Sequence, residues 1–262
     1  MADGPVAVVT GGSSGIGRAT DAHLVAGGYR VLICARGVDR LEETARELGS
    51  DRVAWHACDV SDAAAAEEAI GVAVDRFGRL DALVCAAGVI GSFQSISELT
   101  PAGWDEVLRI NLMGPIFFTK AATPALRESG GGAVVIVSSV NAHQAEPAMA
   151  PYGVAKAGLV NFTMYAALEL APLGIRVNCV APGWVLTPMA EPFFREAGLL
   201  DVPVAFNMQR RAARPAELAS VIAFLLGDGA SFVTGTTVVA DGGMITQMAG
   251  LRPADDAEDL AP

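Results

Sequence analysis

Tyr152 and Lys156, four positions apart, carry the clearest chemistry in the sequence. A helix is predicted over about residues 151–170, and this spacing places both side chains on one face of it. An isolated phenol has a pKa of about 10, and a nearby ammonium group favours the phenolate and lowers that pKa. A tyrosine tuned in this way can donate a proton to a carbonyl oxygen or accept one from an alcohol. The spacing alone is weak evidence, because it also arises by chance in helices.

A glycine-rich segment near the start of the chain reads Thr10-Gly11-Gly12-Ser13-Ser14-Gly15-Ile16-Gly17. It lies between a predicted strand at residues 6–10 and a predicted helix at residues 15–26. Gly11 permits a tight turn, Gly15 lets the backbone approach a pyrophosphate, and Gly17 allows the helix to pack closely on the sheet. The unpaired N–H groups of a helix N-terminus can then bind phosphate. The strand–turn–helix context favours a dinucleotide site over a merely structural turn.

Strands and helices alternate along the whole chain, and they must position these residues. Further strands are predicted at residues 30–35, 53–57, 80–85, 133–138, 175–181 and 237–240. Further helices are predicted at residues 39–48, 61–77, 101–126 and 215–226, with Ser61 as the N-cap of the second and Pro115 kinking the third. This alternation predicts an α/β fold: a single-domain, Rossmann-like, doubly wound parallel sheet of about seven strands flanked by helices. The domain is expected to span residues 1–248, and residues 249–262 to form an acidic, flexible tail.

Composition and charge exclude several classes of protein. The 262 residues are 52% hydrophobic, but no apolar run reaches the roughly 20 residues that span a bilayer. No secretory signal is apparent, and the cysteines lack paired spacing, which favours reduced thiols in the cytoplasm over disulfides or a metal site. These cysteines are Cys34, Cys58, Cys85 and Cys179. The formal net charge of -11 argues against a nucleic-acid partner, so the phosphates of a cofactor would be met by local amides and a few cations.

The TGGSSGIG segment resembles the TGxxxGxG cofactor motif of the short-chain dehydrogenase/reductase family, and the resemblance extends over about residues 5–244. It implies a nicotinamide-dependent oxidoreductase with Tyr152 and Lys156 in catalysis, in which an oxidised nicotinamide would act with Lys156 to lower the pKa of Tyr152. Ser139 stands thirteen residues before Tyr152, the usual family offset, and its hydroxyl would hydrogen-bond the substrate oxygen. Asn111 resembles the asparagine that holds a water linking the lysine to solvent, although taken alone it could be an ordinary buried, bonded amide.

The end of the second predicted strand bears on the choice of cofactor. An NAD-specific fold usually has an acidic residue there, whereas this chain has Ala35 followed by Arg36. A guanidinium group binds a 2′-phosphate through charge-assisted hydrogen bonds, so the resemblance implies NADP(H); the alternative is a solvated arginine at a strand end. Ser14 replaces the second basic residue of many NADP-dependent relatives, and Ser13 could donate its hydroxyl to the phosphate instead.

Three further segments resemble cofactor-binding motifs of the family. Asp59-Val60 resembles the adenine-binding pair, although Asp59 could equally cap the next helix. Cys85-Ala86-Ala87-Gly88 stands where the family usually has NAAG, and a thiol is a poor substitute for the asparagine that ties neighbouring strands. A buried, inert thiol is expected there, with a redox role as the alternative. Pro182-Gly183-Trp184-Val185-Leu186-Thr187 resembles PGxxxT, in which the Val185 backbone and the Thr187 side chain would hold the carboxamide.

Residues 187–214 are expected to form a lid over an apolar substrate pocket. The side chains expected at this pocket are Phe193, Phe194, Leu199, Leu200, Phe206, Met208, Gln144, Met149 and Trp184. Some of the aromatic residues could instead pack between subunits. Arg210, Arg211 and Arg214 could bind an anionic substrate or an acyl carrier, or could simply be solvated.

The resemblance makes reduction of a ketone to a secondary alcohol with NADP(H) the leading hypothesis, as in 3-oxoacyl-carrier-protein and polyketide reductases. An NAD(P)-dependent alcohol dehydrogenase working oxidatively on a steroid, sugar or cyclic diol is the alternative. A non-catalytic nucleotide-binding protein, from a different class, would have no use for Tyr152. The expected partners are a small carbonyl or alcohol substrate, free or carrier-bound, and further copies of the chain in a homodimer or homotetramer. No metal, nucleic acid or membrane is expected to bind.

Overall fold

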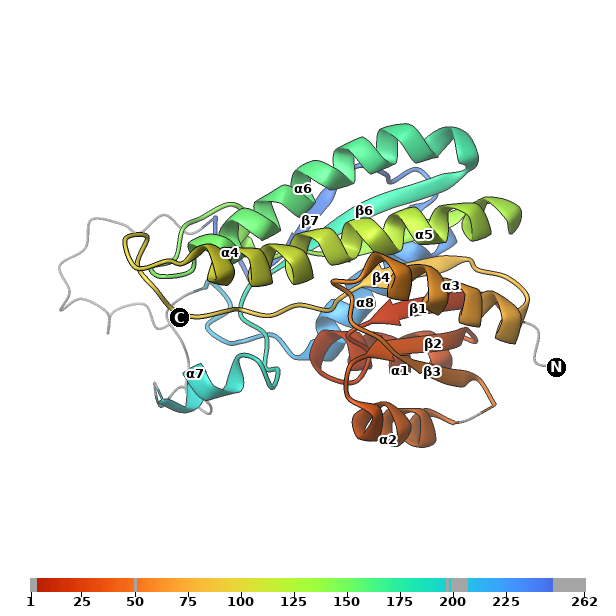
Figure 1. Cartoon of the computed structure of the whole chain (residues 1–262), viewed down its shortest axis with the longest axis horizontal. Coiled ribbons are helices and arrows are strands. Elements are labelled where there is room, and N and C mark those ends of the chain that lie inside the picture. Colours follow the sequence, from red (N-terminus) through yellow and green to blue (C-terminus); the bar gives the residue numbers. More distant parts are fainter. Residues whose placement is uncertain (1–3, 50, 197, 199–206, 247–262) are drawn as a thin grey trace.

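One parallel sheet organises the chain in the computed structural model, which describes residues 4–49, 51–196, 198 and 207–246. Its seven strands lie in the order β3-β2-β1-β4-β5-β6-β7 (Figure 1). They are β1 (Val6–Thr10), β2 (Arg30–Ala35), β3 (Val53–Ala57), β4 (Ala82–Cys85), β5 (Gly132–Val137), β6 (Ile175–Pro182) and β7 (Thr237–Ala240). The strand order reverses between β1 and β4, where doubly wound sheets bind their ligands. The predicted doubly wound parallel sheet is confirmed.

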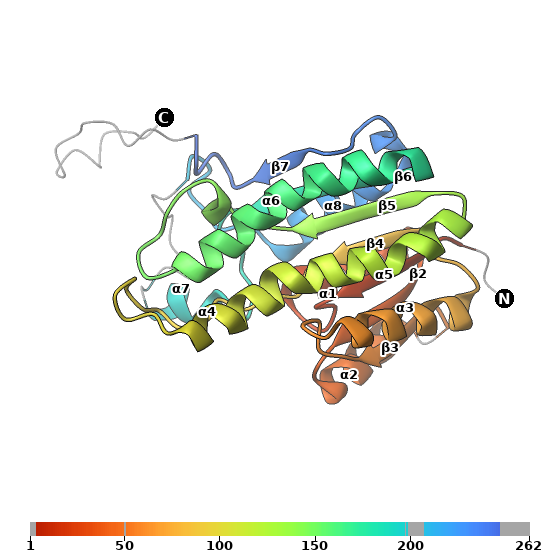
Figure 2. The same cartoon turned by 45° about the horizontal axis from the view of Figure 1, so that its top comes forward.

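Helices cover both faces of this sheet (Figure 2). One face is covered by α3 (Ala63–Phe77), α5 (Gly114–Glu128) and α6 (Ala150–Leu170). The other face is covered by α1 (Gly15–Ala26), α2 (Val38–Leu48) and α8 (Pro215–Leu226). The shorter helices α4 (Pro101–Leu108) and α7 (Glu191–Glu196) lie beyond the carboxyl ends of the strands. Among the described residues, no helix has both the length and the apolarity of a membrane span.

The central strands are buried on both faces, which explains their nearly continuous apolar sequences. In β1, Val6 and Val8 pack into the core beneath α3, α5 and α6. Ala7 and Val9, on the opposite side of the same strand, pack beneath α1, α2 and α8. The sheet is therefore a rigid partition between two cores, and its carboxyl edge is a stable platform for a site.

Helix α3 begins two residues later than predicted. Asp62 is its N-cap and accepts a hydrogen bond at Oδ1 from Ala64 N at 2.9 Å. Ser61 belongs to the preceding turn, where its N–H donates to Asp59 Oδ1 at 2.9 Å. The prediction of Ser61 as the N-cap is wrong, because the neighbouring carboxylate is an equally good cap and is the one placed to reach the helix.

The helix predicted over residues 101–126 is interrupted. Helix α4 ends at Leu108, a π-helical turn spans Arg109–Met113, and α5 begins at Gly114. Pro115 has no N–H, so it cannot bond the carbonyl of Asn111 four residues earlier. The kink predicted at Pro115 therefore takes the form of a wider turn before it, which contains Asn111. The predicted tail at residues 249–262 lies outside the described residues.

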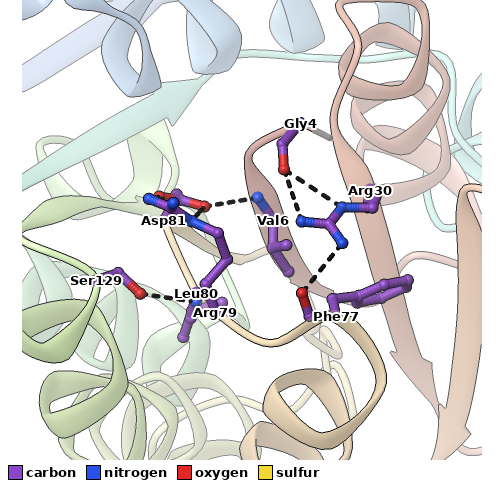
Figure 3. A network of polar contacts seen from close by, with 8 residues as sticks. All are labelled: Gly4, Val6, Arg30, Phe77, Arg79, Leu80, Asp81 and Ser129. Atoms are coloured by element: carbon purple, nitrogen blue, oxygen red, sulfur yellow. Dashed lines mark hydrogen bonds and ion pairs between the residues drawn. The ribbon is translucent and has the colours of Figure 1, made fainter. Parts of the chain in front are cut away.

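Polar side chains connect the amino ends of the strands (Figure 3). Asp81, just before β4, accepts at Oδ2 from Val6 N of β1 at 2.8 Å and is paired with Arg79. Arg30, the first residue of β2, donates to Gly4 O at 2.9 Å and to Phe77 O at 3.0 Å. Leu80 N donates to Ser129 Oγ at 3.0 Å. This network satisfies backbone groups at the edge opposite the carboxyl ends.

Candidate active site

A single cleft at the carboxyl edge of the sheet has a volume of about 370 Å³. Every residue that the sequence indicated for catalysis or cofactor binding lines it. They are Gly11, Ser13, Ser14, Gly15, Ile16, Gly17, Arg36, Asp59, Val60, Ala86, Ala87, Gly88, Asn111, Ser139, Tyr152, Lys156, Pro182, Gly183, Val185 and Thr187. Segments far apart in the sequence meet here because the carboxyl ends of all seven parallel strands share one edge.

The turn between β1 and α1 is shaped by its glycines. Gly11 has a φ of 72°, and a Cβ there would lie 2.8 Å from Ala87 N. A Cβ at Gly17 would lie 2.3 Å from Gly11 O, directly after β1, so the lack of a side chain at Gly17 allows α1 to approach the end of this strand closely. Ser14, the N-cap of α1, makes no side-chain bond to the first turn. The turn thus leaves an open cradle at a helix N-terminus, which fits a pyrophosphate.

Two guanidinium groups flank the far end of the cleft, where β2 ends. Arg36 follows β2 directly, and Arg40 lies in the first turn of α2; both line the cleft. Neither forms an ion pair with any residue that the structure describes. The sequence analysis missed Arg40. The signal that could have identified it is a second arginine in the first turn of the helix predicted shortly after Arg36.

Asp59 is held in a turn at the same end. Its Oδ1 accepts from Ser61 N, and hydrogen bonds from Ser61, with smaller contributions from Arg36 and Arg109, hold the pKa of Asp59 below its usual value. The alternative that Asp59 caps the next helix is wrong, because Asp62 is the N-cap of α3 and Asp59 Oδ1 bonds only the preceding turn. Contact with adenine stays a prediction for this residue and for Val60.

Lys156 is buried, with only 5% of its surface exposed. Burial lowers the pKa of Lys156 to about 8, and the nearby Cys179 and Cys85 thiols oppose this change. Its Nζ donates to Val137 O at 2.8 Å and lies 5.5 Å from the centre of the Tyr152 ring. The ammonium group is thus fixed by the end of β5 and has a pKa close to neutrality.

The protein's own groups raise the pKa of Tyr152, whereas the predicted lowering was the joint effect of Lys156 and an oxidised nicotinamide and stays a prediction. Burial of the phenol is the main cause; a hydrogen bond from Ser139 opposes it, and the negative charge of Glu146 adds to it. Lys156 lies over the ring and is not among these causes, because its Nζ is directed to the Val137 carbonyl. Without a cofactor, Tyr152 is therefore a protonated phenol near neutral pH.

Adjacent serines after β5 have different environments. Ser138 Oγ donates to Lys156 O at 2.8 Å and so supports helix α6. Ser139 Oγ accepts from Asn141 N at 3.2 Å, which leaves the hydroxyl proton available toward Tyr152 and the cleft. This arrangement favours Ser139 over Ser138 as the hydroxyl that acts on a substrate oxygen.

Asn111 is fully buried, and its amide is bonded to protein. Oδ1 accepts from Val89 N at 3.0 Å, while Nδ2 donates to Val89 O at 2.8 Å and Val107 O at 3.1 Å. The alternative of a bonded structural amide therefore describes this side chain. A water relay to Lys156 would have to use the Asn111 carbonyl, which Pro115 cannot bond. Gly88 lies against both groups: a Cβ there would be 2.7 Å from Asn111 Oδ1 and 3.7 Å from Lys156 Nζ.

The segment after β4 is tied to β1 without the usual asparagine. Thr10 Oγ1 accepts from Ala86 N at 3.2 Å and from Ala87 N at 3.3 Å. Cys85 is buried, and burial raises the pKa of its thiol to about 12. These findings favour the inert thiol over a redox role, and Thr10 supplies the strand-to-strand bonds that Cys85 cannot.

The segment after β6 crosses the cleft toward the phosphate turn. A Cβ at Gly183 would lie 2.9 Å from Asp241 Cα, so this position requires glycine. The Thr187 hydroxyl accepts from Ala190 N at 3.3 Å, and its methyl group would lie 3.2 Å from a Cβ at Gly15. Thr187 thus caps the turn that precedes α7 and narrows the cleft over Gly15. Contact between a carboxamide and Val185 or Thr187 stays a prediction.

The predicted substrate residues are only partly brought together. Met149 and Trp184 line the cleft, whereas Phe193 and Phe194 pack behind Trp184, with ring centroids at 6.2 Å and 5.3 Å. Gln144 does not line the cleft and Met208 is 57% exposed. The remaining three, Leu199, Leu200 and Phe206, lie outside the described residues.

The three arginines at the end of the predicted lid are surface residues. Arg211 is paired with Glu217 at 2.7 Å, and the Arg214 N–H donates to the same carboxylate at 2.8 Å. These bonds lower the pKa of Glu217 to about 2. Arg210 is exposed, so the three side chains fit the solvated alternative better than an anion site.

Comparison with known proteins places this cleft in a family context. A family model described as Enoyl-(Acyl carrier protein) reductase matches residues 11–245. The chain is 36% identical to human dehydrogenase/reductase SDR family member 4 over 240 residues, 91% of this chain and 86% of that protein. It is 40% identical to cis-4-hydroxycyclohexanecarboxylate dehydrogenase of Sinomonas cyclohexanicum over 248 residues, 91% of this chain and 95% of that protein.

Solved structures agree with these sequence matches. A short-chain type dehydrogenase/reductase from Mycobacterium ulcerans superposes with a TM-score of 0.88 at 29% identity, covering 93% of this chain and 90% of that one. A variant of actinorhodin polyketide ketoreductase with NADPH superposes with a TM-score of 0.86 at 35% identity, covering 93% of this chain and 98% of that one. The chain therefore belongs to the short-chain dehydrogenase/reductase family, whose members are nicotinamide-dependent oxidoreductases.

Proposed function

We propose that this chain is an NADP(H)-dependent reductase that converts a ketone to a secondary alcohol, with Tyr152 as the proton donor. The observation that carries the proposal is the composition of the cleft. Tyr152, Ser139 and Lys156 lie at one end of it. At the other end lie an open glycine cradle and two guanidinium groups that form no ion pair with any described residue.

The cofactor end fits a phosphorylated dinucleotide. The α1 N-terminus and the turn from Gly11 to Gly17 would hold the pyrophosphate, and Arg36 and Arg40 would hold a 2′-phosphate. Arg40 supplies the second cation that Ser14 cannot. A bound NADP(H) supplies or receives the hydride. An NADPH complex is known for the polyketide ketoreductase that superposes on this chain, which agrees with this assignment.

The protein's own groups manage the proton. Since burial raises the pKa of Tyr152, its phenol holds a proton near neutral pH and donates it to the oxygen of a bound carbonyl. Ser139 donates a second hydrogen bond to that oxygen as negative charge develops on it. Lys156, with a pKa of about 8, can exchange a proton near neutrality and positions Tyr152 from one helical turn away.

Oxidation of a ring alcohol is the second candidate function. It is favoured by the 40% identity to a protein named as a hydroxycyclohexanecarboxylate dehydrogenase. The same residues would act in reverse: Tyr152 would accept the alcohol proton once a bound oxidised cofactor had lowered its pKa.

A panel of ring and open-chain ketones and their alcohols, assayed with NADPH, NADH and their oxidised forms, tests the proposal. We expect ketone-dependent NADPH consumption with a clearly lower kcat/KM for NADH. Turnover confined to the alcohols would support the second candidate, and a preference for NADH would overturn the role of the arginines. No turnover of any compound would contradict the proposed function.

We further propose that the chain forms a homodimer or homotetramer through α6. This helix has an exposed apolar stripe that includes Val154, Tyr165 and Leu168, of which Leu168 is 74% exposed. An exposed stripe of this kind is characteristic of interfaces. Light scattering of the wild type and Leu168→Glu tests this: the wild type should be oligomeric and the variant monomeric, and a monomeric wild type would contradict it.

A further inference from the structure

The catalytic end of the cleft contains a carboxylate that takes no part in the proposed proton transfer. Of the described residues that line the cleft, only Asp59 and Glu146 are acidic, and Asp59 lies at the opposite end. Glu146 belongs to the loop between the short helical turn Val140–Ala142 and α6. It therefore stands beside the space that a substrate would fill, and not beside the phosphate cradle.

The loop holds Glu146 in a defined position. Asn141 Nδ2 donates to Glu146 Oε2 at 3.1 Å, and Asn141 N donates to Ser139 Oγ at 3.2 Å. Asn141 thus links the carboxylate to the serine that acts on the substrate oxygen. Ala148 in the same loop has a φ of 61°, which is uncommon for a residue with a side chain, and its carbonyl accepts from Gln94 N at 3.3 Å. Such a strained, anchored conformation is typical of functional loops.

The negative charge of Glu146 is uncompensated within the described part of the chain. No lysine, arginine or histidine described there forms an ion pair with it. Lys156, the cation of the catalytic end, is directed to the Val137 carbonyl. Glu146 lines the same cleft as Tyr152 and Ser139, and its charge is the smallest of the three contributions to the pKa of Tyr152. A substrate therefore meets this charge close to its reacting carbonyl.

We propose that Glu146, positioned by Asn141, is a specificity-determining residue that selects carbonyl substrates with a second hydrogen-bond donor, a hydroxyl or an ammonium group, and rejects carboxylates. The inference rests on the proposed function, because it concerns the substrate of the same site. Met149, Trp184 and Met189 also line this end of the cleft. They would contact an apolar substrate ring that separates the reacting carbonyl from the second hydrogen-bond donor. A donor would compensate the carboxylate, whereas an anion would leave two like charges together in a partly desolvated space.

Four cyclohexanones that differ only at carbon 4 test this selection. The substituents are hydroxyl, dimethylamino (protonated at neutral pH), methyl and carboxylate. The wild type should reduce the hydroxyl and ammonium compounds with a kcat/KM at least about tenfold above that of the carboxylate, with the methyl compound between them. Glu146→Gln preserves the bond to Asn141 and should reduce this ratio to about threefold or less, and Glu146→Lys should reverse it.

Glu128→Gln is the matched control, since it removes the same charge from the exposed end of α5 outside the cleft. It should leave the wild-type ratio unchanged, and thermal unfolding of every variant confirms that it is folded. Equal kcat/KM values for the four ketones in the wild type, or an unchanged ratio in Glu146→Gln, would overturn the inference and leave ketone reduction intact. Failure of the wild type to reduce any of the four, together with the wider panel above, would instead overturn the proposed function.

Discussion

The two edges of the sheet use polar groups in opposite ways. At the amino edge, Asp81, Arg30 and Ser129 bond backbone groups of neighbouring strands and loops. At the carboxyl edge, the α1 N-terminus is uncapped by Ser14, and Arg36 and Arg40 form no ion pair with described residues. The polar groups of the amino edge thus bond within the protein and stabilise the fold, whereas the helix N-terminus and the two arginines of the carboxyl edge are available to a ligand. Variants of the ligand-facing groups at the carboxyl edge should change catalysis or cofactor binding, and variants at the amino edge should change the free energy of unfolding.

The serines after β5 give the largest contrast. Ser139→Ala should lower kcat for ketone reduction by about 10²- to 10³-fold, because it removes a hydrogen-bond donor to the developing oxyanion. Ser138→Ala removes only the bond to Lys156 O and should lower the free energy of unfolding by about 1 kcal/mol, with a much smaller effect on kcat. Steady-state kinetics and urea unfolding of both variants check this. Equal rate losses in the two would remove the distinction between the serines.

The arginines at the end of β2 should affect affinity for one cofactor only. Arg36→Ala should weaken NADPH binding by about 10- to 100-fold, and Arg40→Ala by somewhat less, with little change for NADH. The reason is that each guanidinium group would lose a charge-assisted bond to the 2′-phosphate, which NADH lacks. Isothermal titration calorimetry measures the four dissociation constants. A parallel loss of NADH binding would show that the arginines do not read the phosphate.

At the amino edge, Asp81→Ala should destabilise the fold without changing catalysis. It leaves Val6 N without its acceptor, at a cost of about 1–3 kcal/mol in the free energy of unfolding. Arg79→Ala is the control, because it removes the exposed partner of the same carboxylate and should cost under about 1 kcal/mol. Urea unfolding together with kcat measures both effects. A large fall in kcat for folded Asp81→Ala would break the comparison between the edges.

Asp21 is the exception to the comparison. It is fully buried beneath the phosphate turn, no described residue bonds either carboxyl oxygen, and burial raises its pKa well above the usual value. Below about pH 4 the carboxyl group is protonated in both the folded and the unfolded state, so its burial carries no charge penalty. As pH rises from there toward the raised folded-state pKa, the unfolded state ionises first and the fold loses stability. Asp21→Ala should therefore raise the free energy of unfolding at pH 7 by about 1–2 kcal/mol, and by less at pH 4. Urea unfolding at both pH values checks this, and a less stable variant at pH 7 would contradict it.

Much of the fold and the site was predictable from the sequence, because both depend on local patterns. Apolar runs bounded by turns predicted the strands, and the family motifs follow strand ends that must meet at one edge. The π-helical turn at Arg109–Met113 was not predictable in form, because a proline predicts a break but not how the preceding residues accommodate it.

Residues whose position depends on tertiary structure were missed. Arg40 lines the cleft from the start of α2, close to the end of β2, and Glu146 lines it from a loop in which the Ala148 carbonyl accepts from Gln94 N. Thr10 replaces the usual asparagine through contacts between β1 and the segment after β4, which lie 76 positions apart. The burial that raises the pKa of Tyr152 was also missed, because the spacing to Lys156 does not show how deeply the phenol lies or where the ammonium group points.

The most direct test of the account is the Tyr152→Phe variant, measured for ketone-dependent NADPH consumption and for NADPH affinity in parallel. The phenol hydroxyl is the proposed proton donor, and the ring can remain in place against Lys156 without it. The account predicts that kcat falls by about 10³-fold or more while the dissociation constant for NADPH stays within about threefold of the wild type. Wild-type turnover in the folded variant would contradict the assignment of Tyr152 as the proton donor.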